Sequence, residues 1–209
     1  MVAILSLWLM AGCVGDVGKD KAAAVVEEVT PAPVADAEEE PAEATQDGSL
    51  AVEVSRSSVK ALGAKVTATH PIVFKDFSGS VALDGDAVAS VSFDVQMATL
   101  EADSPRLTEH LKNEDFFDVP NHPTSTFRST DVKAEAEGAS HSVTGDLTIR
   151  GTTKRVTFPA TLVVSEGEVT ANAEFTINRQ DFKVVYPGRP DDLVQDSVVL
   201  TIALVAPRS

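Results

Sequence analysis

Hydrophobic and polar residues alternate along most of the chain from Ser49 onward. The alternation is clearest at 89–97, where Val91, Phe93, Val95 and Met97 occupy every second position with polar residues between them. Because successive side chains of a strand point to opposite faces, this spacing predicts a strand with one buried face. Similar patterns predict further strands at 50–54, 59–69, 81–83, 126–132, 142–149, 155–164, 168–177 and 197–205.

Two local signals add a turn and a helix to this pattern. The Asp-Gly-Asp sequence at 84–86 follows a predicted strand and is typical of a hairpin. At 104–112, Ser104 can cap a helix, Pro105 suits its first turn, and Leu107 and Leu111 are spaced to face inward. About eight antiparallel strands with one or two short helices predict an all-β sandwich or closed barrel.

The first residues have a different composition. Residues 2–10 are almost wholly apolar and are followed by Ala11, Gly12 and Cys13. This run is shorter than the roughly 20 residues that a transmembrane helix needs. It is typical of a lipoprotein signal peptide over 1–12, with Cys13 as the site of lipid attachment. The alternative is an apolar N-terminus with no such function.

Cys13 is the only cysteine, so the chain can form no internal disulfide. Residues 13–48 then contain ten acidic and two basic side chains, with prolines at 31, 33 and 41. Such a composition favours a solvated, extended segment. We therefore expect 13–48 to be a disordered acidic tether, and the folded domain to occupy 49–209.

Three separated motifs carry a family resemblance. They are Glu114–Thr130, with its double phenylalanine and two prolines, Gly145–Lys154, and Ile177–Phe182. In order and spacing they resemble the YceI-like family of lipocalin-like, polyisoprenoid-binding envelope proteins, over roughly 49–206. The resemblance implies an antiparallel eight-stranded lipocalin-like β-barrel. One departure is Lys183, which stands where the family often has glycine.

The resemblance also implies a function. Relatives of this kind bind polyprenyl lipids or isoprenoid quinones, and an eight-stranded barrel is wide enough to hold one small ligand. Burial contributes about 0.8 kcal/mol per methylene, so a long tail needs no polar anchor. The hydrophobic pattern and the motifs suggest twelve ligand-binding residues: Phe74, Phe93, Val95, Met97, Leu107, Leu111, Phe117, Phe127, Phe158, Phe175, Arg179 and Tyr186. For Arg179, we prefer an ion pair with Asp181 or Asp196 that closes the barrel end, and contact with a ligand head group is the alternative.

Other chemistry finds little support in the sequence. The four histidines, at 70, 110, 122 and 141, have no metal-site spacing, so we expect no metal and no cofactor. Serines 55, 57 and 58 lie outside a nucleophile elbow, which argues against an enzyme. A net charge of −15 argues against nucleic acid. Two alternatives stay open: an envelope stress or interaction module with a filled core, and an envelope hydrolase.

Location follows from the proposed anchor. A lipidated protein of this family belongs to the bacterial cell envelope. Val14, which follows the cysteine, is not the aspartate associated with retention in the inner membrane. We therefore expect the outer membrane, with the domain facing the periplasm, and leave a homodimer open.

Overall fold

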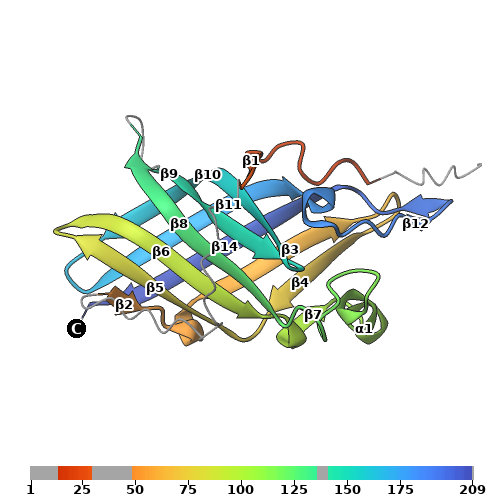
Figure 1. Ribbon diagram of the computed structural model, residues 1–209, viewed down its shortest axis with the longest axis horizontal. Helices are drawn as coiled ribbons and strands as arrows, with labels where there is room; N and C mark the ends of the chain where they lie inside the picture. Colours follow the sequence, from red (N-terminus) through yellow and green to blue (C-terminus); the bar gives the residue numbers. More distant parts are fainter. Residues whose placement is uncertain (1–13, 30–48, 136–140, 209) are drawn as a thin grey trace, which may run out of the picture.

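A computed structural model describes residues 14–29, 49–135 and 141–208. It contains one curled twelve-stranded sheet and a separate two-stranded hairpin (Figure 1). Along the sheet the strands follow the order β2 (Ser49–Ala51), β5 (Phe77–Asp84), β6 (Ala87–Gln96), β8 (Thr124–Ala134), β9 (His141–Ile149), β10 (Thr152–Val164), β11 (Glu168–Asn178), β14 (Ser197–Pro207), β3 (Ser58–Ala64), β4 (Thr69–Phe74) and β7 (Leu100–Ala102), with β1 (Val25–Glu28) beside β10.

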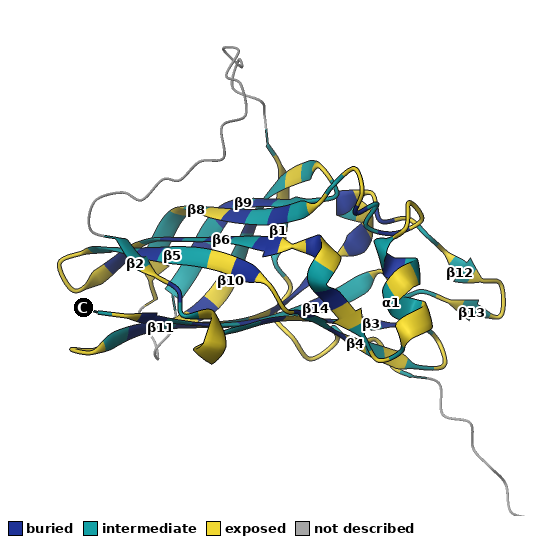
Figure 2. Ribbon diagram, turned by 90° about the horizontal axis from the view of Figure 1, so that it is seen from below, coloured by how far each residue is buried: buried dark blue, intermediate teal, exposed yellow. Residues whose placement is uncertain are grey.

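The predicted all-β class is confirmed, and the sheet curls as a lipocalin-like barrel does. Buried and exposed residues alternate along its strands, which places one face of each strand in the core (Figure 2). The sheet has twelve strands rather than the expected eight. The segment predicted as one strand at 59–69 instead contains nearly all of β3 and the turn after it, and it ends at the first residue of β4. That turn carries no glycine or proline signal. Short strands, among them β1 and β7, supply the other additions.

The two ends of the barrel differ. Helix α1 (Pro105–Lys112) and the hairpin of β12 (Gly188–Arg189) and β13 (Asp192–Leu193) lie at one end, and β2 and the C-terminus lie at the other (Figure 1). We call these the α1 end and the far end. The helix forms as predicted: the Ser104 hydroxyl accepts a hydrogen bond from the Leu107 amide at 3.3 Å, and Leu111 is buried.

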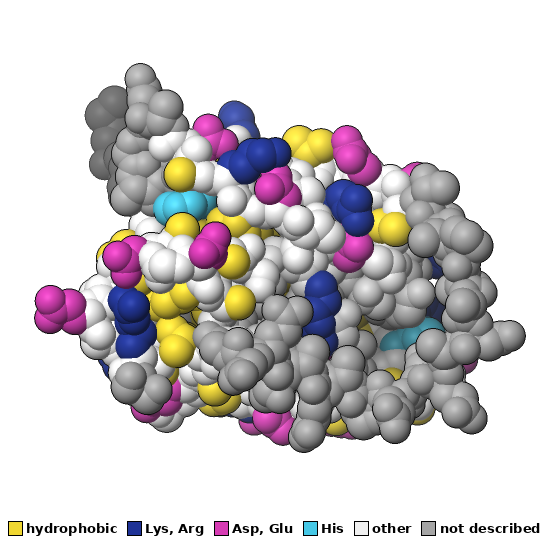
Figure 3. Space-filling view, turned by 60° about the vertical axis from the view of Figure 1, so that its left-hand side comes forward, with side chains coloured by type: hydrophobic (Ala, Val, Ile, Leu, Met, Phe, Trp, Pro, Cys, Tyr) yellow, Lys and Arg dark blue, Asp and Glu magenta, His cyan; other side chains and the backbone are white. Residues whose placement is uncertain are grey.

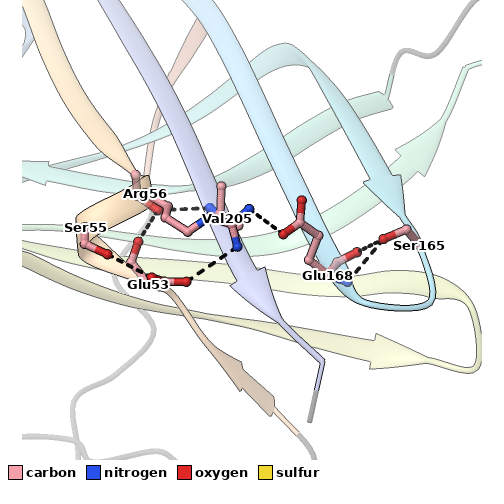
Figure 4. Close-up of polar contacts among 7 residues, drawn as sticks. Glu53, Ser55, Arg56, Ser165, Glu168 and Val205 are labelled. Carbon is pink, nitrogen blue, oxygen red and sulfur yellow. Dashed lines mark hydrogen bonds and ion pairs between the residues drawn. The ribbon is translucent and has the colours of Figure 1, made fainter.

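Strand β14 is held to the chain that follows β2 by polar contacts at the far end (Figure 4). Glu53 immediately precedes the 3₁₀ turn η1 (Val54–Arg56), and its amide donates to the Val205 carbonyl on β14 at 2.8 Å. The Arg56 guanidinium lies 2.6 Å from the Glu168 carboxylate on β11, and this partner raises the pKa of Arg56. These contacts join the first residues of the barrel to β14 and to the start of β11.

The three sequence motifs meet in space. Arg150, from the second motif, donates to the carbonyl of Glu114 at 2.6 Å and also to the carbonyl of Lys183, which follows the third. The ring of His122 covers Gly151, where an added Cβ would lie 2.7 Å from a ring carbon. The motifs therefore form one structural unit at the α1 end, which explains why they occur together.

The expected tether is corrected over 14–29. The Ala24 amide donates to the Thr176 carbonyl and the Thr176 amide to the Ala22 carbonyl, both at 2.8 Å, so this segment joins β11. Strand β1 then pairs antiparallel with residues 154–157 of β10. Apolar residues such as Val26, which packs on the core, outweigh the acidic composition here. The rest of the expected tether, at 30–48, lies outside the described residues.

Strand β1 occupies a gap between β10 and β11. These two strands pair directly only from Ala160 to Val164 of β10. Pro159 precedes that stretch and has no amide hydrogen to give to a ladder. On the other side of Pro159 the two strands diverge, and the segment 22–28 fills the space. We call this gap the β1 seam.

Charged side chains of both signs are distributed over the surface. On the face that Figure 3 shows, basic and acidic side chains lie interspersed rather than separated by sign. Within the described residues, no helix combines the length and the apolar character that crossing a bilayer would require.

Candidate functional site

A cavity of about 140 Å³ lies inside the barrel. Its walls come from eight of the barrel strands, together with α1, two short 3₁₀ turns and the loops beside them, and are almost entirely apolar. Ten of the twelve residues expected from sequence lie on this wall: Phe74, Phe93, Val95, Met97, Leu111, Phe117, Phe127, Phe158, Phe175 and Arg179. The alternation of β6 explains much of this agreement, because Phe93 and Val95 project inward from that strand and Met97 continues the same face just beyond it.

Four phenylalanines cross the interior in a continuous row, which we call the aromatic row. The ring centroids of Phe93 and Phe127 are 5.3 Å apart, and those of Phe127 and Phe158 are 5.5 Å apart. Phe158 and Phe175 stack at 4.0 Å. A second cavity of only about 20 Å³ lies on the other side and shares Phe93, Phe127 and Phe158 as lining. The aromatic row is therefore the floor of the main cavity.

Gly145 makes this floor possible. A Cβ at Gly145 would lie 2.5 Å from the tip of the Phe127 ring and 2.6 Å from the Arg128 carbonyl oxygen. Both distances are shorter than any ordinary contact. The glycine of the second sequence motif thus leaves room for the ring that stands at the centre of the row.

A wider and more polar cavity of about 440 Å³ lies at the α1 end, between the helix and the β12–β13 hairpin. We call it the vestibule. Leu111 and Phe116 line both the vestibule and the main cavity, so the two adjoin. The remaining two expected residues, Leu107 and Tyr186, lie here instead of in the barrel interior. Tyr186 packs 5.0 Å from the rings of His110 and Phe116.

The vestibule also carries charged groups. Lys65, Arg106 and Arg189 are among its lining residues, together with Asp192. The Lys65 ammonium lies 2.6 Å from the Asp192 carboxylate. Hydrogen bonds from Lys65 and then Thr67 lower the pKa of Asp192.

Arg179 is held by the protein itself. It lies in the 3₁₀ turn η3 (Arg179–Phe182), is 6% exposed, and forms an ion pair with Asp196 at 2.9 Å. Its guanidinium also donates to the Gln195 carbonyl at 3.0 Å and to the Val184 carbonyl. The expected ion pair with Asp196 is thus present. Arg179 thus holds the two ends of the segment at 184–196 together beside the main cavity. It also forms part of the lining of that cavity.

Lys183 ends the same turn in a left-handed conformation, with φ of +59°. This conformation favours glycine. Lys183 therefore adopts, with a Cβ, a conformation that glycine adopts more readily.

Sequence reasoning missed Ser125. It is 9% exposed, lines the main cavity, and its hydroxyl oxygen has no hydrogen-bond partner in the described structure. The signal was present in β8, since Ser125 is two residues before Phe127 and therefore shares its inward face. A buried hydroxyl without a partner costs about 1–3 kcal/mol.

The described residues hold no cluster of three or more histidine, cysteine, aspartate or glutamate side chains that suits a metal ion. In the same part of the chain, Lys60, Ser125, Arg179 and Gln195 are the polar side chains of the main cavity, and they include no nucleophile with an adjacent base. Cys13, the expected lipid-attachment residue, lies outside the described residues.

The fold and the site together define a curled antiparallel barrel with an apolar internal cavity that adjoins a polar vestibule. Residues 45–206 match the model of the YceI-like domain. The chain therefore belongs to the YceI-like family, as the three motifs indicated. The segment that fills the β1 seam lies outside the matched residues.

Solved structures with the same architecture support this assignment. The chain is similar to BcnA of Burkholderia cenocepacia, with 28% identity and a TM-score of 0.66 over 74% of this chain and 99% of that one. It also resembles a polyisoprenoid binding domain of Saccharophagus degradans implicated in plant cell wall breakdown. There the TM-score is 0.64 over 76% of this chain and 98% of that domain. At 11% identity, that likeness shows the fold alone.

This chain matches a smaller share of the length of its sequence relatives. A UPF0312 protein of Pseudomonas putida is 37% identical over 124 residues, which is 55% of this chain and 64% of that protein. Its name states no activity.

Proposed function

We propose that the barrel binds the hydrocarbon tail of one long-chain amphiphilic lipid, a polyisoprenoid or an isoprenoid quinone, and does not catalyse a reaction. The main cavity carries this proposal, because it is apolar, ends at the aromatic row and adjoins a polar vestibule. An amphiphile needs such a pair of environments for its two parts. The polyisoprenoid binding domain with the same fold is consistent with this ligand class.

The size of the cavity sets how such a lipid would fit. An apolar cavity of about 150 Å³ can stay dry and bind benzene. The cavity of about 140 Å³ is of that size, so it accepts only a short piece of a tail as it stands. Each further methylene contributes about 0.8 kcal/mol on burial, which can offset the movement of wall side chains. The long tail therefore enlarges the cavity as it binds.

The polar side chains that line the main cavity, within the described residues, do not form a catalytic pair. A hydrolase needs a nucleophile and a base within hydrogen-bond reach of each other. Ser125 is the hydroxyl in the main cavity, and among the described residues it has no partner. The hydrolase alternative would require measurable turnover of a lipid ester by the purified protein.

Membrane attachment is the second part of the proposal. Residues 1–12 would act as a lipoprotein signal peptide, and Cys13 would carry the lipid in the cell envelope, at the outer membrane and facing the periplasm. Several acyl chains hold a protein firmly, whereas one gives only marginal binding. Replacement of Cys13 by serine should then abolish acyl labelling and release the protein from membranes. Unchanged fractionation would refute this part.

Native mass spectrometry with lipid extraction tests the ligand. Protein from a bacterial envelope should carry a lipid of polyprenyl mass, and titration with a polyprenol should restore that mass after delipidation. Val95→Phe should weaken this binding, since Val95 is buried and lines the main cavity. Val163→Phe is the matched control, because Val163 is 47% exposed on the outside of β10.

The alternative of a filled-core interaction module makes the opposite prediction. It requires that the protein carry no lipid and bind no polyprenol under the same conditions. Equal binding by the wild type and Val95→Phe would also contradict the proposed site.

A further inference from the structure

We infer that the α1 end of the barrel docks on a membrane surface, with the vestibule facing the lipid. This inference rests on the proposed lipid attachment at Cys13. Three independent features of the α1 end carry it: the position of Val14, the exposed apolar residues around the vestibule, and the direction in which the main cavity adjoins that vestibule.

Val14 is fixed at the rim of the α1 end. Its amide donates to the Val66 carbonyl at 3.0 Å, and the amide of Val66 in turn donates to the Leu193 carbonyl on β13. The Gln195 side chain, which lines the main cavity, donates to the Gly15 carbonyl at 3.2 Å. Val14 is bonded directly to Cys13, so a lipid on that cysteine would be attached beside the vestibule.

The following residues prevent the barrel from turning away from this attachment. From Val14 the segment runs along the barrel to the β1 seam, where it pairs with β11 and β10 (Figure 1). Lys21 adds an ion pair with Glu174 at 2.7 Å. The expected tether would have let the domain rotate freely. A segment fixed over this length instead holds the α1 end next to the anchor.

Three of the six exposed large apolar side chains among the described residues lie at the same end. Leu193 is 49% exposed, Val185 is 57% exposed and Val66 is 37% exposed. Each adjoins a residue that lines the vestibule, namely Val194, Tyr186 and Lys65. The vestibule also contributes Arg106 and Arg189, and guanidinium groups bind phosphate well. Apolar side chains beside such groups suit the interface of a phospholipid bilayer.

The geometry also suits the movement of a lipid tail. In this orientation the tail would pass from the bilayer through the vestibule to the main cavity, which adjoins it at Leu111 and Phe116. Each methylene exposed to water on the way would cost about 0.8 kcal/mol. An orientation with the far end on the membrane would expose the whole tail. The contact with the membrane therefore serves the exchange of ligand.

The test uses the chain from Cys13 onward, which contains every described residue. Its single thiol, Cys13, is coupled to a maleimide phospholipid in vesicles of phosphatidylethanolamine and phosphatidylglycerol that also contain brominated lipid. Trp8 is the only tryptophan of the sequence, so this chain has none. Leu193→Trp then reports on the α1 end. Val163→Trp is the control, because it lies beside the far-end turn and has a similar exposure of 47%.

Brominated lipid should quench the fluorescence of Leu193→Trp and leave that of Val163→Trp unchanged. Val185→Trp is a second reporter at the α1 end and should behave like Leu193→Trp. Equal quenching at both ends, or no quenching at either in protein that floats with the vesicles, would overturn the inference.

The vesicles contain no polyprenyl lipid, and the anchor is attached chemically. The result therefore depends neither on the proposed ligand nor on lipidation in the cell. Polyprenol binding by the same chain is measured separately by native mass spectrometry. Binding without quenching at Leu193→Trp refutes the orientation alone, whereas quenching without binding refutes the proposed ligand alone.

Discussion

The ring of Phe158 lies flat against that of Phe175, with centroids 4.0 Å apart and ring planes inclined by 8°. The two residues belong to the strands that border the β1 seam. Direct pairing of β10 and β11 begins only at Ala160, two residues after Phe158. The stacked rings thus continue the contact between β10 and β11 in the interior, where the backbone ladder has already ended.

Phe158→Ala should therefore open the floor of the main cavity. Truncation of a buried phenylalanine costs about 3–5 kcal/mol of unfolding free energy. Here it would also join the main cavity to the small one beyond the aromatic row. Urea unfolding measures the loss, and Val163→Ala on the outer face of the same strand is the control. A loss below about 1 kcal/mol would mean that Phe158 is not part of the core.

Phe93→Trp tests whether the main cavity has spare volume. In a filled core the larger ring would cost about 1–3 kcal/mol. Phe93 borders the main cavity, so we expect the added ring to enter that space and the melting temperature of the ligand-free protein to stay near native. Binding of a polyprenyl lipid should weaken. A large fall in melting temperature, together with no lipid in the wild-type protein, would favour the filled-core module.

Ser125→Ala should stabilise the ligand-free protein. Removal of a buried hydroxyl that lacks a partner relieves a cost of about 1–3 kcal/mol. Thermal unfolding of delipidated protein measures this gain. Ser129→Ala is the control, because the Ser129 hydroxyl accepts a hydrogen bond from the Val91 amide at 2.9 Å, and its removal should destabilise. Destabilisation by both changes would show that Ser125 has a partner.

Lys183→Gly should also raise stability. The left-handed conformation costs a residue with a Cβ about 1–2 kcal/mol, and glycine adopts it freely. The bond that Arg150 donates to this residue uses the backbone carbonyl and would remain. Lys183→Ala keeps the Cβ and should bring no gain. Chemical denaturation of the three proteins distinguishes relief of strain from loss of the lysine charge.

The ion pair of Asp192 and Lys65 should make stability depend on pH. Hydrogen bonds from Lys65 and Thr67 lower the pKa of folded Asp192. The contribution of Asp192 to stability is therefore fully present above the ordinary aspartate pKa of about 3.9. That contribution is lost as pH falls through the lowered value. Asp192→Asn should thus lower the melting temperature at neutral pH, and the difference from wild type should vanish in acid. A difference that is constant with pH would exclude this cause.

Several parts of the fold and the cavity could be predicted from the sequence. Period-two spacing placed Phe93 and Val95 on an inner face, and the Ser104 cap marked the start of α1. These signals are local, since each depends on residues within one element. The choice of a barrel rested on the resemblance of three motifs to the YceI-like family. The contacts between these motifs form only in the folded chain.

Other features could not be predicted in this way. The acidic composition of 13–48 concealed strand β1, whose partners on β10 become available only in the folded barrel. Leu107 and Tyr186 have the hydrophobic character of cavity residues, yet the position of α1 places them in the vestibule. Ser125 is polar, so the hydrophobic pattern did not indicate it, although its spacing from Phe127 places it on the inward face of β8. Composition indicates the structure that a segment favours in isolation. In each of these cases the observed position depends on contacts with segments that are distant in the sequence.

The β1 seam also bears on the order in which the protein folds. Lys21 and Glu174, which form an ion pair beside the seam, are 153 positions apart in the chain. Pairing over such a separation costs more loop-closure entropy than formation of the local β10–β11 hairpin. We therefore expect the segment at 14–29 to be placed late, after its two partner strands have formed. Until it arrives, the nearly finished barrel presents two strand edges with free hydrogen-bonding groups, and at this stage it is most exposed to pairing with a neighbouring chain.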